Sequence, residues 1–184
     1  MAFAAVLVVL VAVNVWVHVG PRRAHLVTGP LAAAVLLVIG RAAGLSWAEL
    51  GLGAGSLLRG LRWGGACAAV VVAGYVVALA VPALHRFFLD TRYRLGLRPA
   101  FGAAFLSVPL GTVVFEEVAF RGVLWALVED RSGAAWATAV TALLFGLWHV
   151  LPSLGLREAN AAVGSLVGAG ASATVVAVVA ACAW

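Results

Sequence analysis

Two adjacent glutamates and one arginine interrupt a long apolar stretch of the chain. The segment VVFEEVAFRGVLW contains Glu116, Glu117 and Arg121, and all of its remaining residues are apolar or glycine. A carboxylate at the centre of a bilayer costs about 2.5–3.5 kcal/mol on insertion scales, so two of them need a reason. Glu117 and Arg121 are four residues apart on one helical face, which predicts an ion pair. Glu116 points about 100° away around the helix and has no basic partner within its own helix.

A histidine on the next apolar segment lies at the expected depth of Glu116. The polar link Glu129–Gly133 between the two segments is short, which predicts that they pack as antiparallel helices. Glu116 and His149 are equidistant from a point between Ser132 and Gly133, inside that link, so each is expected roughly 20 Å from the turn at 1.5 Å per residue. A Glu–His pair in a protein-lined cavity can activate water, relay protons or bind an ion. The chemistry alone leaves these three alternatives open.

The remaining polar groups are weaker candidates for chemistry. His18 and His25 flank the end of the first apolar segment beside arginines, where anchoring at the membrane interface explains them. Asn14 and Asn160 can make hydrogen bonds between helices. Neither cysteine has another Cys or a His at metal-ligand spacing. The chain also has no HExxH and no GxSxG sequence, the motifs of the standard zinc-protease helix and the serine-hydrolase elbow.

Long apolar runs must hold the candidate residues in a membrane. Hydrophobic residues make up 65% of the 184-residue chain and charged residues 10%, which is too apolar for the surface of a soluble domain. The sequence predicts an all-α polytopic membrane protein with about six transmembrane helices. The expected spans are Ala2–Val19, Leu26–Ile39, Trp63–Leu84, Ala100–Val128, Ala134–Leu151 and Ala161–Trp184. Tryptophans near the span ends are expected in the headgroup zone: Trp16, Trp63, Trp125, Trp136, Trp148 and Trp184.

The segments between the spans carry most of the charge. The formal net charge of +5 comes entirely from arginine, and the composition, without lysine, is typical of a bacterium with a GC-rich genome. In a membrane protein, arginines in loops are topology signals, so we expect membrane lipid and no nucleic acid as a partner. The less apolar, Gly-rich segment Ser46–Gly60 predicts a short amphipathic helix along the interface. These features indicate a multi-pass protein of the cell membrane.

Two short motifs on consecutive predicted helices resemble a known family. Glu116-Glu117-Val-Ala-Phe-Arg121 reads as EExxxR, and Phe145-Gly-Leu-Trp-His149 reads as FxxxH. Together they resemble the motifs of the CAAX protease and bacteriocin-processing family of intramembrane proteases, which includes the type II CAAX prenyl endopeptidases of the Rce1 type. The resemblance extends from about Ser46 to the C-terminus. It implies transmembrane helices at 1–45 followed by a CAAX-protease-like membrane domain at 46–184.

The resemblance implies an activity and a role for each motif residue. Glu116 would be the general base and His149 its partner in activating a water. Glu117 and Arg121 would hold the motif helix, and Phe145 would contact the substrate. The implied reaction is hydrolysis of a peptide bond in a membrane-associated, prenylated protein or peptide. Bacterial members are described as metalloproteases, and a divalent metal is compatible with two visible protein ligands without being required by them.

The sequence departs from the family pattern at its C-terminal end. Family members carry, on a later helix, a His followed four residues later by Asn or Asp, which resembles an oxyanion hole. No histidine follows His149 here, so we expect the last helix of the family core to be missing. Losing oxyanion donors costs roughly two to three orders of magnitude in rate. The alternatives are therefore a catalytically impaired scaffold or bacteriocin-immunity protein of this family, and a proton-relay or transporter component.

Overall fold

The chain is built from helices. The computed structural model describes residues 1–21, 24–89, 91, 95–153, 159–163, 175–176 and 179, and these residues contain no strand. In chain order the elements are α1 (Ala2–Val19), α2 (His25–Ala42), α3 (Ala54–Ala80), α4 (Pro82–His85), η2 (Arg86–Phe88), α5 (Leu97–Gly102), η4 (Ala103–Ser107), η5 (Pro109–Val113), α6 (Val114–Glu116), η6 (Glu117–Leu124), α7 (Trp125–Ser132), α8 (Ala134–Trp148) and α9 (Val150–Ser153). The protein is an all-α polytopic membrane protein, as the sequence predicts.

The helices reproduce most of the predicted spans. Within the part of the chain that the structure describes, three helices are long and apolar enough to cross a membrane, namely Ala2–Val19, Ala54–Ala80 and Leu97–Ser132. Leu26–Ala42 and Ala134–Trp148 are apolar but shorter. These five regions correspond to the first five expected spans, although the third begins nine residues earlier than the expected Trp63. Most of the sixth expected span, Ala161–Trp184, lies outside the described residues.

The predicted interface helix at Ser46–Gly60 is wrong. The backbone N–H of Ser46 donates to Glu49 Oε2 at 2.6 Å, and the N–H of Glu49 donates to Ser46 Oγ at 3.2 Å. This reciprocal pair closes one turn, and Gly51 then adopts a φ of +76° that only glycine enters at low cost. The rest of the segment, from Ala54 onward, is the first part of α3. The first part of the segment, with Gly51, therefore makes a turn between two spans.

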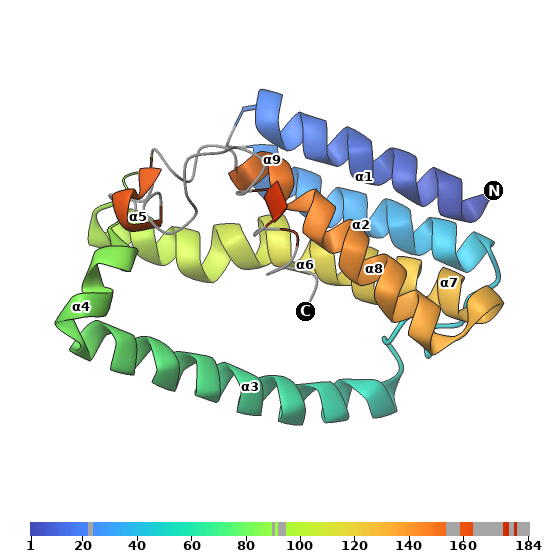
Figure 1. Cartoon of the computed structure of the whole chain (residues 1–184). Coiled ribbons are helices and arrows are strands. Elements are labelled where there is room, and N and C mark those ends of the chain that lie inside the picture. The colour runs from blue at the N-terminus through green and yellow to red at the C-terminus, as the bar shows by residue number, and fades with distance from the viewer. Residues whose placement is uncertain are drawn as a thin grey trace.

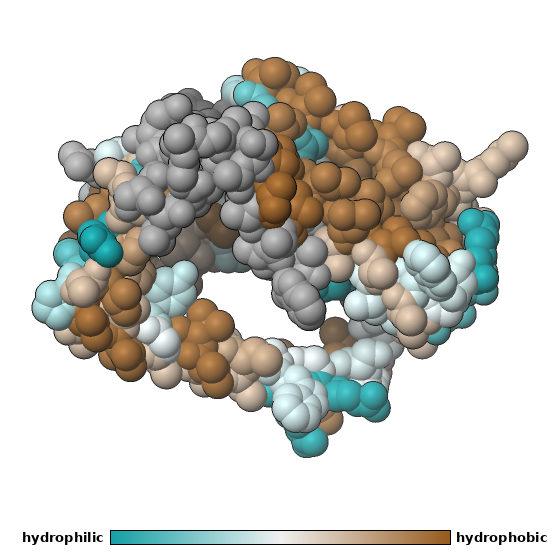
Figure 2. Space-filling view, in the orientation of Figure 1, coloured by the Kyte–Doolittle hydropathy of each residue, from teal (hydrophilic) through white to brown (hydrophobic). Residues whose placement is uncertain are grey.

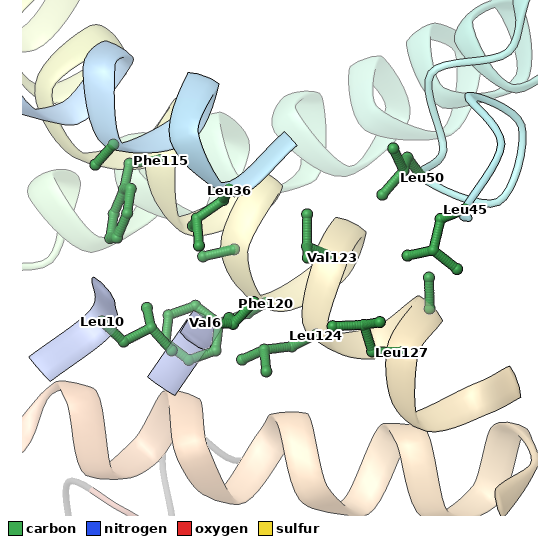
Figure 3. Close-up of a cluster of buried hydrophobic side chains, with 13 residues drawn as sticks. Val6, Leu10, Leu36, Leu45, Leu50, Phe115, Phe120, Val123, Leu124 and Leu127 are labelled. Atoms are coloured by element: carbon green, nitrogen blue, oxygen red, sulfur yellow. The ribbon is translucent and has the colours of Figure 1, made fainter. Parts of the chain in front are cut away.

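The motif-bearing helix is the buried centre of the bundle. Its residues between 115 and 127 pack against α1, α2 and the turn after α2 (Figure 3). The buried cluster consists of Val6, Leu10, Ala32, Leu36, Leu45, Leu50, Phe115, Ala119, Phe120, Val123, Leu124, Ala126 and Leu127. Helix α8 lies along this helix as well, and α1 and α2 run beside the same bundle (Figure 1). Because lipid is as apolar as these side chains, close packing rather than water exclusion holds them together.

The same span contains wide helical turns. Three stretches, Ala103–Ser107, Pro109–Val113 and Glu117–Leu124, are π-helical, with hydrogen bonds reaching five residues back. The last of them carries Glu117 and Arg121. Such turns occur frequently at functional sites, since they change the direction in which side chains leave the helix. Hydropathy gives no signal for them, and the sequence did not predict them.

Two glycines bring α2 close to the motif-bearing span. A Cβ added to Gly29 would lie 2.3 Å from the backbone oxygen of Gly111 and 3.0 Å from its Cα. Backbone atoms cannot move aside as a flexible side-chain tip can. The contact between α2 and η5 therefore depends on glycine at Gly29.

We expect Gly29→Ala to destabilise the protein by about 1–3 kcal/mol, because the new methyl group forces two helices apart. The matched control is Gly74→Ala in α3, where a Cβ meets no described atom within 4 Å. That change should be neutral or slightly stabilising, since alanine is the better helix former. Thermal unfolding in detergent measures both variants. Equal melting temperatures for the two would contradict the close contact.

Helix α3 stands apart from the other helices. None of its residues between Ala54 and Ala80 is buried, and Figure 1 shows it running at a distance from the bundle. Figure 2 shows open space between this helix and the remaining chain. Beyond Arg59 and Arg62 near its start, the helix is almost entirely apolar and exposed, which suits a lipid environment. The positions of the candidate site residues therefore depend on α1, α2 and the helices after residue 97.

Candidate active site

The two motif helices form a tight hairpin. Helix α7 ends at Ser132 and α8 begins at Ala134, so Gly133 is the only residue between them. Its φ of +81° strains any residue with a side chain. The N–H of Gly133 donates to the Glu129 carbonyl at 2.9 Å, and its own carbonyl accepts from Ala137 N–H at 3.0 Å. The helices therefore run back along each other from a single-residue turn.

The hairpin brings Glu116 and His149 together, as their equal distance from the turn predicts. Glu116 Oε1 lies 3.9 Å from His149 Nε2, and their side chains are 12% and 27% exposed. Both line a cavity of about 270 Å³ whose wall also includes residues of α1, α2, η5 and α9. The polar side chains in its lining are Asn14, His18, Thr112, Glu116 and His149. Of the predicted site residues, Glu116 and His149 line this cavity, and Glu117, Arg121 and Phe145 do not.

Trp148 fixes the carboxylate of Glu116. Its indole Nε1–H donates to Glu116 Oε1 at 2.8 Å. The indole packs on Phe115 and Phe120, with ring centroids 5.5 and 5.9 Å away. The N–H of Trp148, a residue expected in the headgroup zone, is therefore satisfied inside the protein. Sequence reasoning missed this contact, and its one local signal is the position of Trp148 directly before His149.

A backbone carbonyl selects the tautomer of His149. Nδ1 of the ring lies 2.9 Å from the carbonyl oxygen of Phe145, one helical turn earlier. A carbonyl only accepts, so Nδ1 carries the proton of the neutral ring. Nε2 then presents its lone pair toward Glu116. The Phe145 ring packs edge-on against the imidazole at 4.5 Å between centroids and holds its orientation.

The predicted ion pair is confirmed, and it lies on another face of the helix. Arg121 Nη1 is 2.9 Å from Glu117 Oε1, and each side chain is 54% exposed. The Arg121 guanidinium also lies 4.7 Å over the Phe145 ring. Phe145 thus contacts Arg121 on one motif helix and His149 on its own. This chain of contacts connects the EExxxR and FxxxH segments.

Helix α1 contributes polar groups that the sequence did not point to as site residues. Asn14 Nδ2 donates to the backbone carbonyl of Trp148 at 3.1 Å, which confirms the expected hydrogen bond between helices. His18, expected as an interface anchor, lines the cavity, and its Nδ1 lies 2.6 Å from the Asn14 carbonyl. The available signal was their spacing of four residues in an otherwise apolar helix. That spacing places both on one face.

The family of the second half of the chain follows from a comparison with known proteins. Residues 98–184 match the family described as type II CAAX prenyl endopeptidase Rce1-like. This segment is Rce1-like. The match includes both motifs and confirms the resemblance that they suggested. No significant match was found among curated proteins or among solved structures.

The Rce1-like segment and the helices before it build the site together. The segment supplies the whole EExxxR and FxxxH hairpin, whereas α1 and α2 precede residue 98. The Rce1-like family is a family of proteases of the membrane-embedded CAAX type. The cavity lined by Glu116 and His149, called the polar cavity below, also includes Asn14 and His18, which lie outside the matched residues.

The cavity offers few side chains that could bind a metal ion. Catalytic zinc takes three protein ligands and keeps one position for water. Among the described residues, no three His, Cys, Asp or Glu side chains come together. Glu116 and His149 supply only two ligands, so the visible residues do not fit a zinc site of the usual kind.

Proposed function

We propose that the chain is an intramembrane endopeptidase that hydrolyses a peptide bond through a water held between Glu116 and His149. The observation that carries the proposal is the 3.9 Å separation of Glu116 Oε1 and His149 Nε2. That distance is too long for a direct hydrogen bond, and one water spans it with two hydrogen bonds of about 2.8 Å. Nδ1–H of His149 donates to the Phe145 carbonyl, so Nε2 carries no proton. The two groups that face the water, Nε2 and the Glu116 carboxylate, are therefore both acceptors.

The proposed reaction needs one proton carrier. The water donates one proton to Glu116 and the other to His149, so that its oxygen lone pairs face the substrate. As the water oxygen attacks the carbonyl carbon, Glu116 takes a proton, and the carbonyl π electrons move onto the carbonyl oxygen. When the intermediate collapses, the C–N bond breaks and Glu116 returns that proton to the amine nitrogen. The second water proton stays on the new carboxyl group until solvent removes it.

The surroundings of the cavity favour a hydrophobic substrate. A second, apolar cavity of about 340 Å³ lies between α1 and α8 and shares Asn14 and Trp148 with the polar one. Its apolar lining includes Leu7, Leu10, Phe120, Leu144, Leu147 and Leu151. An apolar chain placed there would bring an attached peptide beside Glu116. We therefore propose a membrane-associated, prenylated protein or peptide as substrate, cleaved at the cell membrane, with Glu117 and Arg121 supporting the motif helix. Phe145, expected from the family resemblance to contact the substrate, lines neither cavity and packs against the His149 imidazole.

The direct test is cleavage by the chain reconstituted in liposomes. The probe is a prenylated peptide that carries a fluorophore and a quencher, and mass spectrometry of the products identifies the bond. We expect cleavage at one peptide bond, at a rate well above that of empty liposomes. In parallel, a pH-sensitive dye inside the liposomes reports proton movement. Proton flux without cleavage would favour a proton-relay component. The absence of both cleavage and proton flux would favour a scaffold.

A further inference from the structure

Two arginines line a cavity on the first turns of α3, apart from the candidate active site. The cavity has a volume of about 250 Å³, and its described lining consists of Gly55, Leu58, Arg59, Arg62 and Trp63. This lining includes two positively charged side chains and no carboxylate. Gly55 leaves the space beside it open, since a Cβ added there would meet no described atom within 4 Å. The charge of the lining therefore suits an anion.

Neither guanidinium is neutralised within the part of the chain that the structure describes. The ion pairs found there join side chains of the two motif helices, and neither includes Arg59 or Arg62. The carboxylate closest to them in sequence, that of Glu49, instead accepts the backbone N–H of Ser46. Arg59 and Arg62 are three residues apart, so they leave the same side of the helix. Both can therefore reach one anion, and the planar fork of a guanidinium matches the oxygens of a phosphate.

The cavity lies where the surface of α3 changes from charged to apolar. Beyond Arg62 the helix contains no charged residue, and its exposed side chains there include Val70, Val71 and Val76. Trp63, at the boundary, is exposed, and an indole in that position prefers the headgroup zone of a bilayer. Figure 1 shows α3 apart from the bundle, so lipid has access to its length. An anion at this depth that carries apolar chains would lay those chains along the exposed valines.

We propose that Arg59 and Arg62 bind the phosphate of an anionic glycerophospholipid, whose acyl chains lie along the apolar part of α3. The phosphate oxygens accept hydrogen bonds from both guanidinium groups. A zwitterionic lipid also carries a phosphate, but its own ammonium group offsets the negative charge, so the cavity discriminates between the two lipid classes. The site lies outside the Rce1-like segment and does not depend on the proposed peptidase function.

Lipid binding to the full chain in a neutral detergent tests this site. Native mass spectrometry counts the lipid molecules retained on the protein as the lipid concentration rises, and it gives a Kd for the first of them. The probes are phosphatidylglycerol and phosphatidylcholine with identical acyl chains. We expect one phosphatidylglycerol to bind about 30-fold more tightly than phosphatidylcholine, since each arginine contributes about 5-fold near an anionic lipid. Arg59→Gln and Arg62→Gln should each weaken phosphatidylglycerol binding by about 5-fold, and the double variant should bind both lipids alike.

The matched control is the double variant Arg98→Gln/Arg131→Gln, which removes the same charge from two exposed arginines near the ends of Leu97–Ser132. It should keep the wild-type Kd for phosphatidylglycerol. An equal loss of affinity in the control would overturn the site, because net charge alone would then explain the preference. Glycerophosphoglycerol, the same headgroup without acyl chains, should not displace the lipid, and displacement at equal concentration would overturn the assignment to a lipid. If the double cavity variant does not insert into the membrane, the two single variants decide the inference.

Discussion

We expect Glu116→Gln to lower the rate of reporter cleavage by roughly 10²–10⁴-fold, the contribution that a positioned general base makes. Glutamine has the shape of glutamate, and its amide oxygen still accepts the Trp148 indole N–H that now lies 2.8 Å from Oε1. The amide cannot take a proton from the water. The variant should therefore keep the fold and the substrate KM and lose kcat. Initial rates across peptide concentrations separate these two parameters.

The matched control for this variant is Glu129→Gln. Glu129 is a carboxylate on the same continuous helix, at its exposed end near the Gly133 turn. It carries no contact to the cavity, so its removal should change the rate less than twofold. Melting temperatures of both variants should stay close to that of the wild type. A Glu116→Gln protein that cleaves at the wild-type rate would rule out Glu116 as the base.

The second large effect is on stability. Phe120→Ala should destabilise the protein by about 3–5 kcal/mol, the usual cost of deleting a fully packed aromatic ring. Phe120 is 2% exposed, and its ring contacts Phe145 and Trp148 at centroid distances of 5.2 and 5.9 Å. Removing it leaves a cavity below both rings. Unfolding in detergent with added denaturant, followed by tryptophan fluorescence, measures the loss.

The control for this core position is Phe105→Ala on the same span. Phe105 is 72% exposed within the chain, so its ring faces the surroundings rather than the core. We expect this change to lower the free energy of unfolding by less than about 1 kcal/mol, because lipid or detergent takes the place of the ring. Because Trp148 holds Glu116, Phe120→Ala should also reduce kcat at temperatures where the protein is still folded. A stability loss as small as that of Phe105→Ala would contradict the packing of the motif helix at the centre of the bundle.

Local spacing explains why part of the site was predictable. The Glu117–Arg121 ion pair follows from a separation of four residues on one helix. The proximity of Glu116 and His149 follows from equal distances to a short link, because the rise per residue in a helix is constant. Neither inference needs knowledge of which side chains pack. The structure places both pairs within 4 Å.

Contacts between distant segments were not predictable in the same way. Trp148 looked like an interfacial tryptophan because it lies near a span end, and only the packing of three rings turns its N–H toward Glu116. The close approach of Gly29 to Gly111 joins residues more than eighty positions apart. A Gly-rich sequence contains many glycines that would serve such a contact equally well. Nothing in their local sequence marks these two.

The sequence by itself determined the class of protein, an all-α chain of membrane helices, and the residues most suited to chemistry in it. Apolar length and helical rise are properties of the local chain, so they are readable without a fold. Only the tertiary structure decided that α1 enters the site and that Asn14 meets Trp148 there. The physical reason is that apolar residues cover both the packed and the lipid-facing sides of these helices. Hydropathy therefore does not say which face packs, and the choice depends on how side chains of different helices fit together.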